Sequence, residues 1–137
     1  MRKGNNGFTL IEILLVVAII GALAAMVVPR LTGRSEKAKV AATQADLRAN
    51  ISTALKMYEI DVGSFPMTEQ GLDALLRPPS GIDAASWQGA YLERKPVDPW
   101  NRAYRYKFPG EKNPSGYDLY SLGRDGVESE DDIGNWQ

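Results

Sequence analysis

The chain has no cysteine and no histidine among its 137 residues. Without cysteine it forms no disulfide, and without histidine it lacks the commonest acid–base group and metal ligand. The sequence shows no pattern that pairs a nucleophile with a general base, so we do not expect this chain to be an enzyme. Its 16 Lys and Arg residues nearly balance 17 Asp and Glu residues, and the formal charge of -1 gives no sign of nucleic-acid binding.

Charge is also missing from one long stretch, residues 13–28, which holds no strongly polar side chain. Together with the residues before it, from Phe8 to Val28, the apolar segment is 21 residues long, and about 20 suffice to span a bilayer. A leader with Arg2 and Lys3 precedes it, and Glu12 lies at its head. An ionised carboxylate costs about 2.5–3.5 kcal/mol at a bilayer centre and less near the edge, so Glu12 is expected to have a partner.

Three interpretations compete for this stretch. A secretory signal peptide would be cut after the apolar region, near Ala22–Ala25, and the carboxylate would then be unexplained. A plain membrane anchor fits the length alone. A prepilin-type leader would be cut between Gly7 and Phe8, before the apolar region, and Glu12 would become the fifth residue of the mature chain. The residue types around the cut favour this third interpretation.

The run from Gly7 to Glu12 resembles the processing site of type IV pilins and type II secretion pseudopilins. It has a small residue, an aromatic residue, Thr-Leu, a branched residue and a glutamate, followed by the apolar helix. In that family an inner-membrane prepilin peptidase cuts after the glycine and N-methylates the new terminus. The resemblance implies cleavage after Gly7 and methylation of Phe8. Loss of the leader leaves 14 basic and 17 acidic residues, a formal charge of -3.

Cleavage would give Phe8 a free ammonium group four residues before Glu12. The two charges of one chain could pair on a helix, Glu12 could lie among lipid headgroups, or it could pair with the ammonium of a neighbouring copy. The leader motif favours the neighbouring copy. Because an uncompensated buried charge is strongly unfavourable, that pair would fix the axial register of packed helices. We therefore expect Phe8 and Glu12 to direct assembly.

Gly21 and Pro29 are the two helix-weakening residues of the apolar segment. A proline loses a hydrogen bond and clashes with the carbonyl four residues back, which predicts a kink or the end of the spanning segment. A second hypothesis is that residues 21–29 unwind in an assembled filament. Basic residues flank the segment on both sides, so charge alone does not orient it. The resemblance implies a cytoplasmic leader and a periplasmic C-terminal part.

Beyond Pro29, apolar residues recur at spacings of three and four, which predicts an amphipathic helix that ends at Gly63. The predicted helix covers residues 8–60 as a whole. Thr68 is expected to cap a short helix. Alternating residues in two later segments predict paired antiparallel strands, 104–108 and 117–122.

These elements predict an α+β fold in which a small C-terminal domain packs on the second half of the long helix. The expected segments are a leader (1–7), a membrane-spanning and polymerising helix (8–29), an amphipathic helix (30–62) and a small α+β domain (63–137). Several blocks in order resemble the major pseudopilins of type II secretion and imply a pilin-like fold: Ser64-Phe65-Pro66, Thr68 to Leu72, Asp98-Pro99-Trp100, Asp118 to Gly123 and Asp132 to Trp136. An adhesive pilin would normally bring a cysteine pair.

Five carboxylates crowd the positions after Gly123: Asp125, Glu128, Glu130, Asp131 and Asp132. Such clusters suit Ca²⁺, which takes six to eight oxygen ligands, although the spacing is not that of an EF-hand and also fits a solvated acidic loop. The family resemblance implies a structural calcium site. Carried over by position, its ligands are the side chains of Asp125, Asp131 and Asp132, the main-chain oxygens of Leu122 and Val127, and Ser129.

The resemblance implies a structural subunit that polymerises into a helical filament, the periplasmic pseudopilus, and promotes export of folded proteins across the outer membrane. Before assembly the chain would cross the inner membrane once. The implied partners are further copies, minor pseudopilins, the prepilin peptidase and an inner-membrane platform with a cytoplasmic ATPase. The alternatives are a type IV pilin of a surface fibre and a membrane-anchored periplasmic binding module, which the lack of a polar, concave site signature disfavours.

Overall fold

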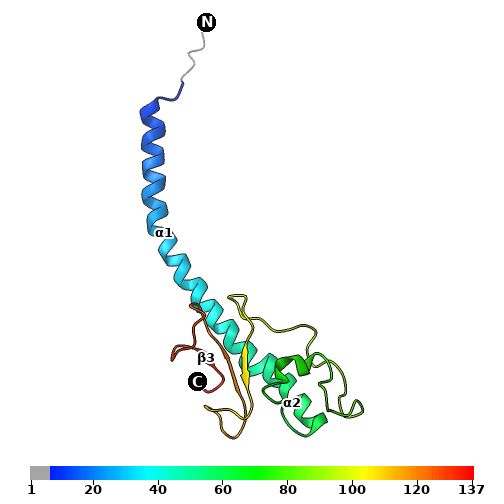
Figure 1. The fold of residues 1–137 in the computed structure, drawn as a ribbon. Helices are drawn as coiled ribbons and strands as arrows, with labels where there is room; N and C mark the ends of the chain where they lie inside the picture. Colours follow the sequence, from blue (N-terminus) through cyan, green and yellow to red (C-terminus); the bar gives the residue numbers. More distant parts are fainter. Residues whose placement is uncertain (1–6) are drawn as a thin grey trace. The chain divides into compact units, whose positions relative to one another are not determined.

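The computed structural model describes residues 7–137, without the side chains of residues 28–32, and the chain forms two compact units, Met1–Lys37 and Ala38–Gln137. Of the predicted leader, residues 1–7, only Gly7 therefore lies within the described residues. The first unit holds most of α1, which runs over Leu10–Ala45 (Figure 1). Helical backbone continues across residues 21–29 in this single chain.

In the second unit the helix changes its winding once. A π-helical turn, η1 (Asp46–Asn50), separates α1 from α2 (Ile51–Val62). Helix α2 ends at Gly63, which has φ of 93° and donates its N–H to the Glu59 carbonyl at 2.8 Å. The predicted glycine terminus is therefore confirmed. The helix begins at Leu10, two residues after the predicted start at Phe8, and the π-helical turn η1 interrupts the stretch that the sequence predicts as continuous helix.

The segment after Gly63 holds one short 3-10 helix, η2 (Gly71–Leu75). The prediction that Thr68 caps this helix is wrong, because Gln70 occupies that position. The Thr68 hydroxyl instead donates to the Phe108 carbonyl and accepts the Phe108 N–H, both at 2.9 Å. Thr68 thus connects the loop before η2 to the end of the first strand.

Three short strands form an antiparallel sheet with the order β1-β2-β3. They are β1 (Arg105–Lys107), β2 (Asp118–Ser121) and β3 (Ile133–Gly134). Tyr106 pairs with Leu119, and Ser121 pairs with Ile133. The first two strands confirm the predicted pair, and β3 adds a third. In Figure 1 the sheet lies along the helix of the second unit, which confirms an α+β fold.

The core of the second unit lies between the helix and the sheet. Its buried side chains come from both: Leu47, Ile51, Ala54, Leu55 and Tyr58 from the helix, Leu72, Ala74 and Leu75 from η2, and Tyr104, Tyr117, Leu119 and Ile133 from the sheet region. Two tyrosine hydroxyls donate hydrogen bonds to residues of the helix. Tyr104 donates to the Asp46 carboxylate at 2.8 Å, and Tyr117 donates to the Ser52 hydroxyl at 2.9 Å. The sheet is thereby held against the helix.

Candidate functional sites: an exposed apolar helix and an acidic loop

Helix α1 begins with a capping box. The main-chain N–H and the hydroxyl of Thr9 both donate to Glu12 Oε2, at 2.8 and 2.9 Å. The Glu12 N–H donates in return to the Thr9 hydroxyl at 3.2 Å. The box satisfies donors at the helix start and explains why α1 begins at Leu10 rather than at Phe8. Thr-x-x-Glu before an apolar run is the signal that the sequence prediction overlooked.

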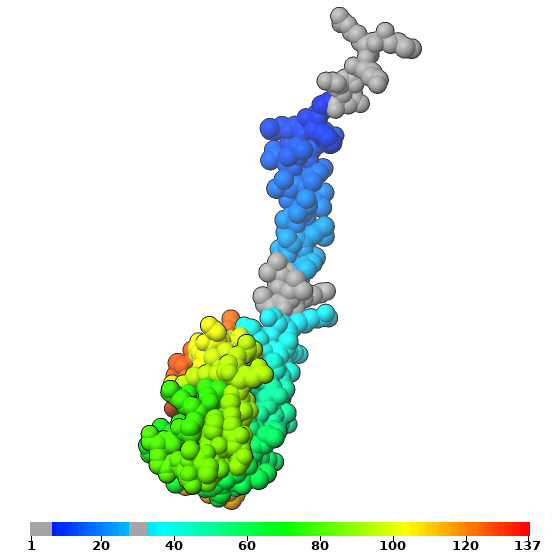
Figure 2. Space-filling view, turned by 90° about the vertical axis from the view of Figure 1, so that its right-hand side faces the viewer, coloured from blue at the N-terminus to red at the C-terminus, as the bar shows by residue number. Residues whose placement is uncertain are grey.

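The apolar part of α1 has no contact that would bury it within its unit. A span of 18 residues, Leu10–Val27, is long and apolar enough to cross a membrane, and none of it is buried. Figure 2 shows residues 8–27 as a single column of side chains. Exposing so much apolar surface to water is unfavourable, so this helix requires lipid or other helices around it.

The other predicted residues of this segment are placed as follows. Gly7 and Phe8 are exposed ahead of the helix, so the bond between them is open to solvent. A Cβ built on Gly21 would meet nothing within 4 Å, so its surface stays open for a close approach by another helix. The side chain of Pro29 lies outside the described residues.

The acidic loop, residues 122–132, begins with a tight turn. Gly123 and Gly126 have φ of 63° and 72°, values that favour glycine. Within this turn the Gly126 N–H donates to the Leu122 carbonyl at 3.3 Å. The Asp125 carboxylate accepts the Val127 N–H at 3.1 Å. Asp125 therefore shapes the first half of the loop.

The second half of the loop is organised around Asp132. This residue is only 4% exposed, and its Oδ1 has no hydrogen-bond partner among the described residues. Its Oδ2 accepts the Ser129 N–H at 3.3 Å, and the Ser129 hydroxyl donates to Asp131. Burial raises the pKa of the Asp132 carboxyl, and three nearby carboxylates raise it further: Glu128, Asp131 and Asp125. A cation would satisfy both the unpaired oxygen and the excess negative charge.

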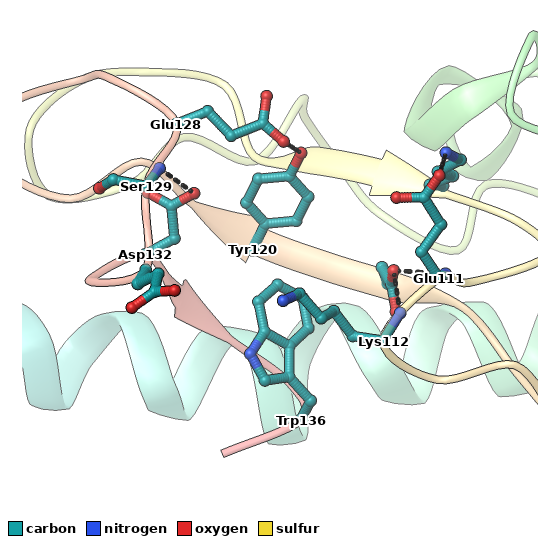
Figure 3. A pocket seen from close by; sticks show the side chains of 10 residues that line it. Glu111, Lys112, Tyr120, Glu128, Ser129, Asp132 and Trp136 are labelled. Atoms are coloured by element: carbon teal, nitrogen blue, oxygen red, sulfur yellow. Dashed lines mark hydrogen bonds and ion pairs between the residues drawn. The ribbon is translucent and has the colours of Figure 1, made fainter.

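A hollow of about 320 Å³ opens beside Asp132 (Figure 3). The rings of Tyr120 and Trp136, with centroids 5.5 Å apart, lie on one part of its wall. The Tyr120 hydroxyl donates to the Glu128 carboxylate at 2.9 Å. Burial, with help from Glu128, raises the pKa of Tyr120 to about 12. Lys107 and Lys112 line another part, so the hollow carries both signs of charge.

The structure brings together part of the predicted ligand set. Ser129 forms hydrogen bonds to both Asp131 and Asp132, whereas Asp125 accepts a hydrogen bond within its own turn. In the described part of the chain, no three acidic side chains lie close enough to hold a metal ion by themselves. A calcium site here would need main-chain oxygens as well. Glu128, which lines the hollow with Asp132, was not among the predicted ligands, although it lies in the same acidic run.

Family comparisons match almost the whole chain. The family described as type II secretion system (T2SS), protein G, matches residues 30–136, and the prokaryotic N-terminal methylation motif matches residues 2–28. The type II secretion system core protein G of Pseudomonas aeruginosa is 48% identical over 141 residues, which cover 98% of this chain and 97% of that protein. The protein of the same name from Klebsiella pneumoniae is 47% identical over 135 residues, 96% of this chain and 94% of the relative.

A solved structure is also similar. The crystal structure of the major pseudopilin from the type 2 secretion system of enterohaemorrhagic Escherichia coli matches with a TM-score of 0.64 and 38% identity, covering 77% of this chain and 89% of that one. The fold, the N-terminal motif and the relatives agree. This chain therefore belongs to the protein G family of type II secretion systems, the major pseudopilins.

Proposed function

We propose that, before assembly, this structural subunit of the type II secretion pseudopilus resides in the inner membrane as a single-pass protein. Residues 10–27 lie in the bilayer and the second unit lies in the periplasm. The exposed apolar helix supports this proposal, because its 18-residue span needs a non-aqueous environment before assembly. Packing against the same helix of other copies would replace the lipid contacts in the filament. The role is structural, and no catalytic step is assigned to the chain.

The processing step is cleavage of the bond between Gly7 and Phe8 by a prepilin peptidase, followed by N-methylation of Phe8. The match of the methylation motif to residues 2–28 supports this assignment. The exposed position of Gly7 and Phe8 leaves the bond accessible. Cleavage creates the ammonium group that the assembly step requires.

The assembly step pairs Glu12 of one copy with the Phe8 ammonium of a neighbour. The capping box uses Glu12 Oε2 and leaves Oε1 for another donor. A charged carboxylate among packed apolar helices is strongly unfavourable unless it is paired, so a copy docked in the wrong register is disfavoured. Thr9 keeps its N–H and hydroxyl after cleavage, so the box persists and presents Glu12 in a fixed orientation.

Other components of the secretion system complete the process. Minor pseudopilins and an inner-membrane platform driven by a cytoplasmic ATPase would add copies to the growing filament. Residues 21–29 would unwind on leaving the membrane, because Pro29 provides no N–H for a helical hydrogen bond and Gly21 weakens the helix. The continuous helix of the single chain is the starting state in this proposal.

The acidic loop would hold a structural Ca²⁺. The ligands would be the carboxylates of Asp125, Asp131 and Asp132, with Ser129 and the main-chain oxygens of Leu122 and Val127. The unpaired Oδ1 of buried Asp132 supports this, since calcium prefers oxygen ligands and repays the burial of the charge. When bound, the ion would fix the acidic loop against the small core.

The observation that carries the assembly proposal is the fully exposed apolar helix with a single carboxylate at its head. The test is to replace Glu12→Gln and to image sheared fibres by electron microscopy, with Glu69→Gln in the second unit as the control. We expect the Glu12 variant to be cleaved and membrane-inserted but to form no filaments, and the control to form them normally. Normal secretion by a Glu12 variant that forms no filaments would indicate an anchored module instead.

A further inference from the structure

A ring of hydrogen bonds through Asp98, Ser121 and Arg102 fixes the start of the acidic loop. Asp98 is 3% exposed, and its Oδ1 accepts the N–H groups of Trp100 and Arg102 at 3.0 and 2.8 Å. Its Oδ2 accepts the Ser121 hydroxyl at 2.6 Å. Ser121 in turn accepts the Gly123 N–H at 3.0 Å. The start of the acidic loop is thereby fixed to the backbone of Arg102.

The Arg102 side chain then reaches the next two peptide groups of the loop. Its Nη1 donates to the Gly123 carbonyl at 2.6 Å and to the Arg124 carbonyl at 3.3 Å. Its Nη2 donates to the Arg124 carbonyl at 3.4 Å. A planar guanidinium with several fixed donors can hold two adjacent carbonyls at once, which a lysine ammonium does less well. The contact joins residues that are 21 and 22 positions apart in the chain.

Gly126 closes the loop over the guanidinium. A Cβ built on Gly126 would lie 2.6 Å from Arg102 Cζ and 2.8 Å from Nε, so only glycine leaves room for this approach. Gly126 also has a φ of 72°, a backbone conformation that favours glycine. The half-buried Arg102 is therefore held by the turn from Gly123 to Gly126, with two carbonyls at its Nη atoms and Gly126 beside its guanidinium.

This arrangement selects which oxygens of the turn are left for a cation. The carbonyls of Gly123 and Arg124 point at Arg102. The Leu122 carbonyl accepts one N–H, from Gly126, and retains a second lone pair. We propose that Arg102 is a positioning residue, which holds the turn 123–126 in the conformation that leaves a lone pair of the Leu122 carbonyl and the second carboxylate oxygen of Asp125 available for Ca²⁺. This inference rests on the calcium site proposed above.

The experiment measures calcium binding to the full chain in detergent by titration with calcium chloride. Arg102→Lys keeps the charge without the planar fork, and Arg102→Gln removes the charge but keeps a donor. Arg124→Gln is the matched control, because it removes a positive charge from the same loop while its main-chain carbonyl remains. If the turn adopts the binding conformation only about a tenth of the time without the fork, the Kd rises about tenfold in both Arg102 variants.

Each alternative gives a different result. Tighter binding by Arg102→Gln than by the unchanged chain would mean that Arg102 repels the cation, and unchanged Kd values with a lower Tm would mean that it only supports the fold. Either result overturns the inference while the calcium proposal stands. If the unchanged chain binds no calcium, both fail. Hydrogen exchange of residues 123–127 in EDTA then reports separately whether Arg102 orders the turn.

Discussion

Replacing Asp132→Asn tests the acidic loop most sharply, because the unpaired Oδ1 of Asp132 is buried in the second unit. A buried polar group without a partner costs about 1–3 kcal/mol, and this cost falls on the calcium-free protein. Calcium at about 100 times its Kd would stabilise the unchanged chain by about 2.7 kcal/mol. In a unit of this size 1 kcal/mol shifts Tm by about 4–8 °C, so the calcium-dependent rise is about 10–20 °C.

The Asn side chain removes the charge and keeps an acceptor for the Ser129 N–H. We therefore expect Asp132→Asn to melt in EDTA at or above the Tm of the unchanged chain, and to lose the calcium-dependent rise. Thermal melts followed by circular dichroism, with and without calcium, measure both effects. Glu130→Gln, an exposed change in the same loop, should keep the rise. A full rise in Asp132→Asn, or a marked fall of its Tm in EDTA, would refute the reasoning.

Two further changes test the second unit. Asp118→Ala should lower the free energy of unfolding of this unit by about 3 kcal/mol or more. The reason is that the buried carboxylate accepts three main-chain N–H groups, from residues 111, 112 and 113, and hydrogen bonds to a charged group contribute about 1.5–3 kcal/mol each. Urea unfolding measures this change, and a loss of no more than about 0.5 kcal/mol, as for an ordinary surface substitution, would contradict the prediction. Alkali should unfold the domain, because burial raises the pKa values of Tyr106, Tyr117 and Tyr120 in the folded state. Their contribution is complete below the ordinary tyrosine pKa of about 10 and is lost as pH rises through the folded values. In an alkaline titration, absorbance at the tyrosinate band should rise together with unfolding. Ionisation of these tyrosines near their ordinary pKa of about 10, in a protein that is still folded, would count against this prediction.

The elements that follow simple residue patterns were predictable. The charge-free run, the glycine terminus at Gly63 and the alternating strands around Tyr106 and Leu119 each depend on neighbours in sequence. The π-helical turn at Asp46–Asn50 was not predictable, because no spacing of apolar residues distinguishes it from an ordinary helical turn. Strand β3 has two residues, too few for an alternating pattern.

The sites divide in the same way. The Thr9–Glu12 box is local and could have been found from the Thr-x-x-Glu spacing. The support of the acidic loop by Asp98 and Arg102 joins residues more than 20 positions apart, and only the paired strands bring them together. The acidic run itself indicated a cation, while the burial of Asp132, which distinguishes it from its neighbours, depends on its place beside β3.

The most direct test of the assembly proposal is a filament structure at side-chain resolution. It should show the mature chain beginning at Phe8, with the Phe8 ammonium of each copy within about 4 Å of the Glu12 carboxylate of a neighbour, the distance of an ion pair. Glu12 should still accept the Thr9 hydrogen bonds of its own chain. A filament in which Glu12 contacts only its own chain, with the neighbour's Phe8 ammonium elsewhere, would contradict the account.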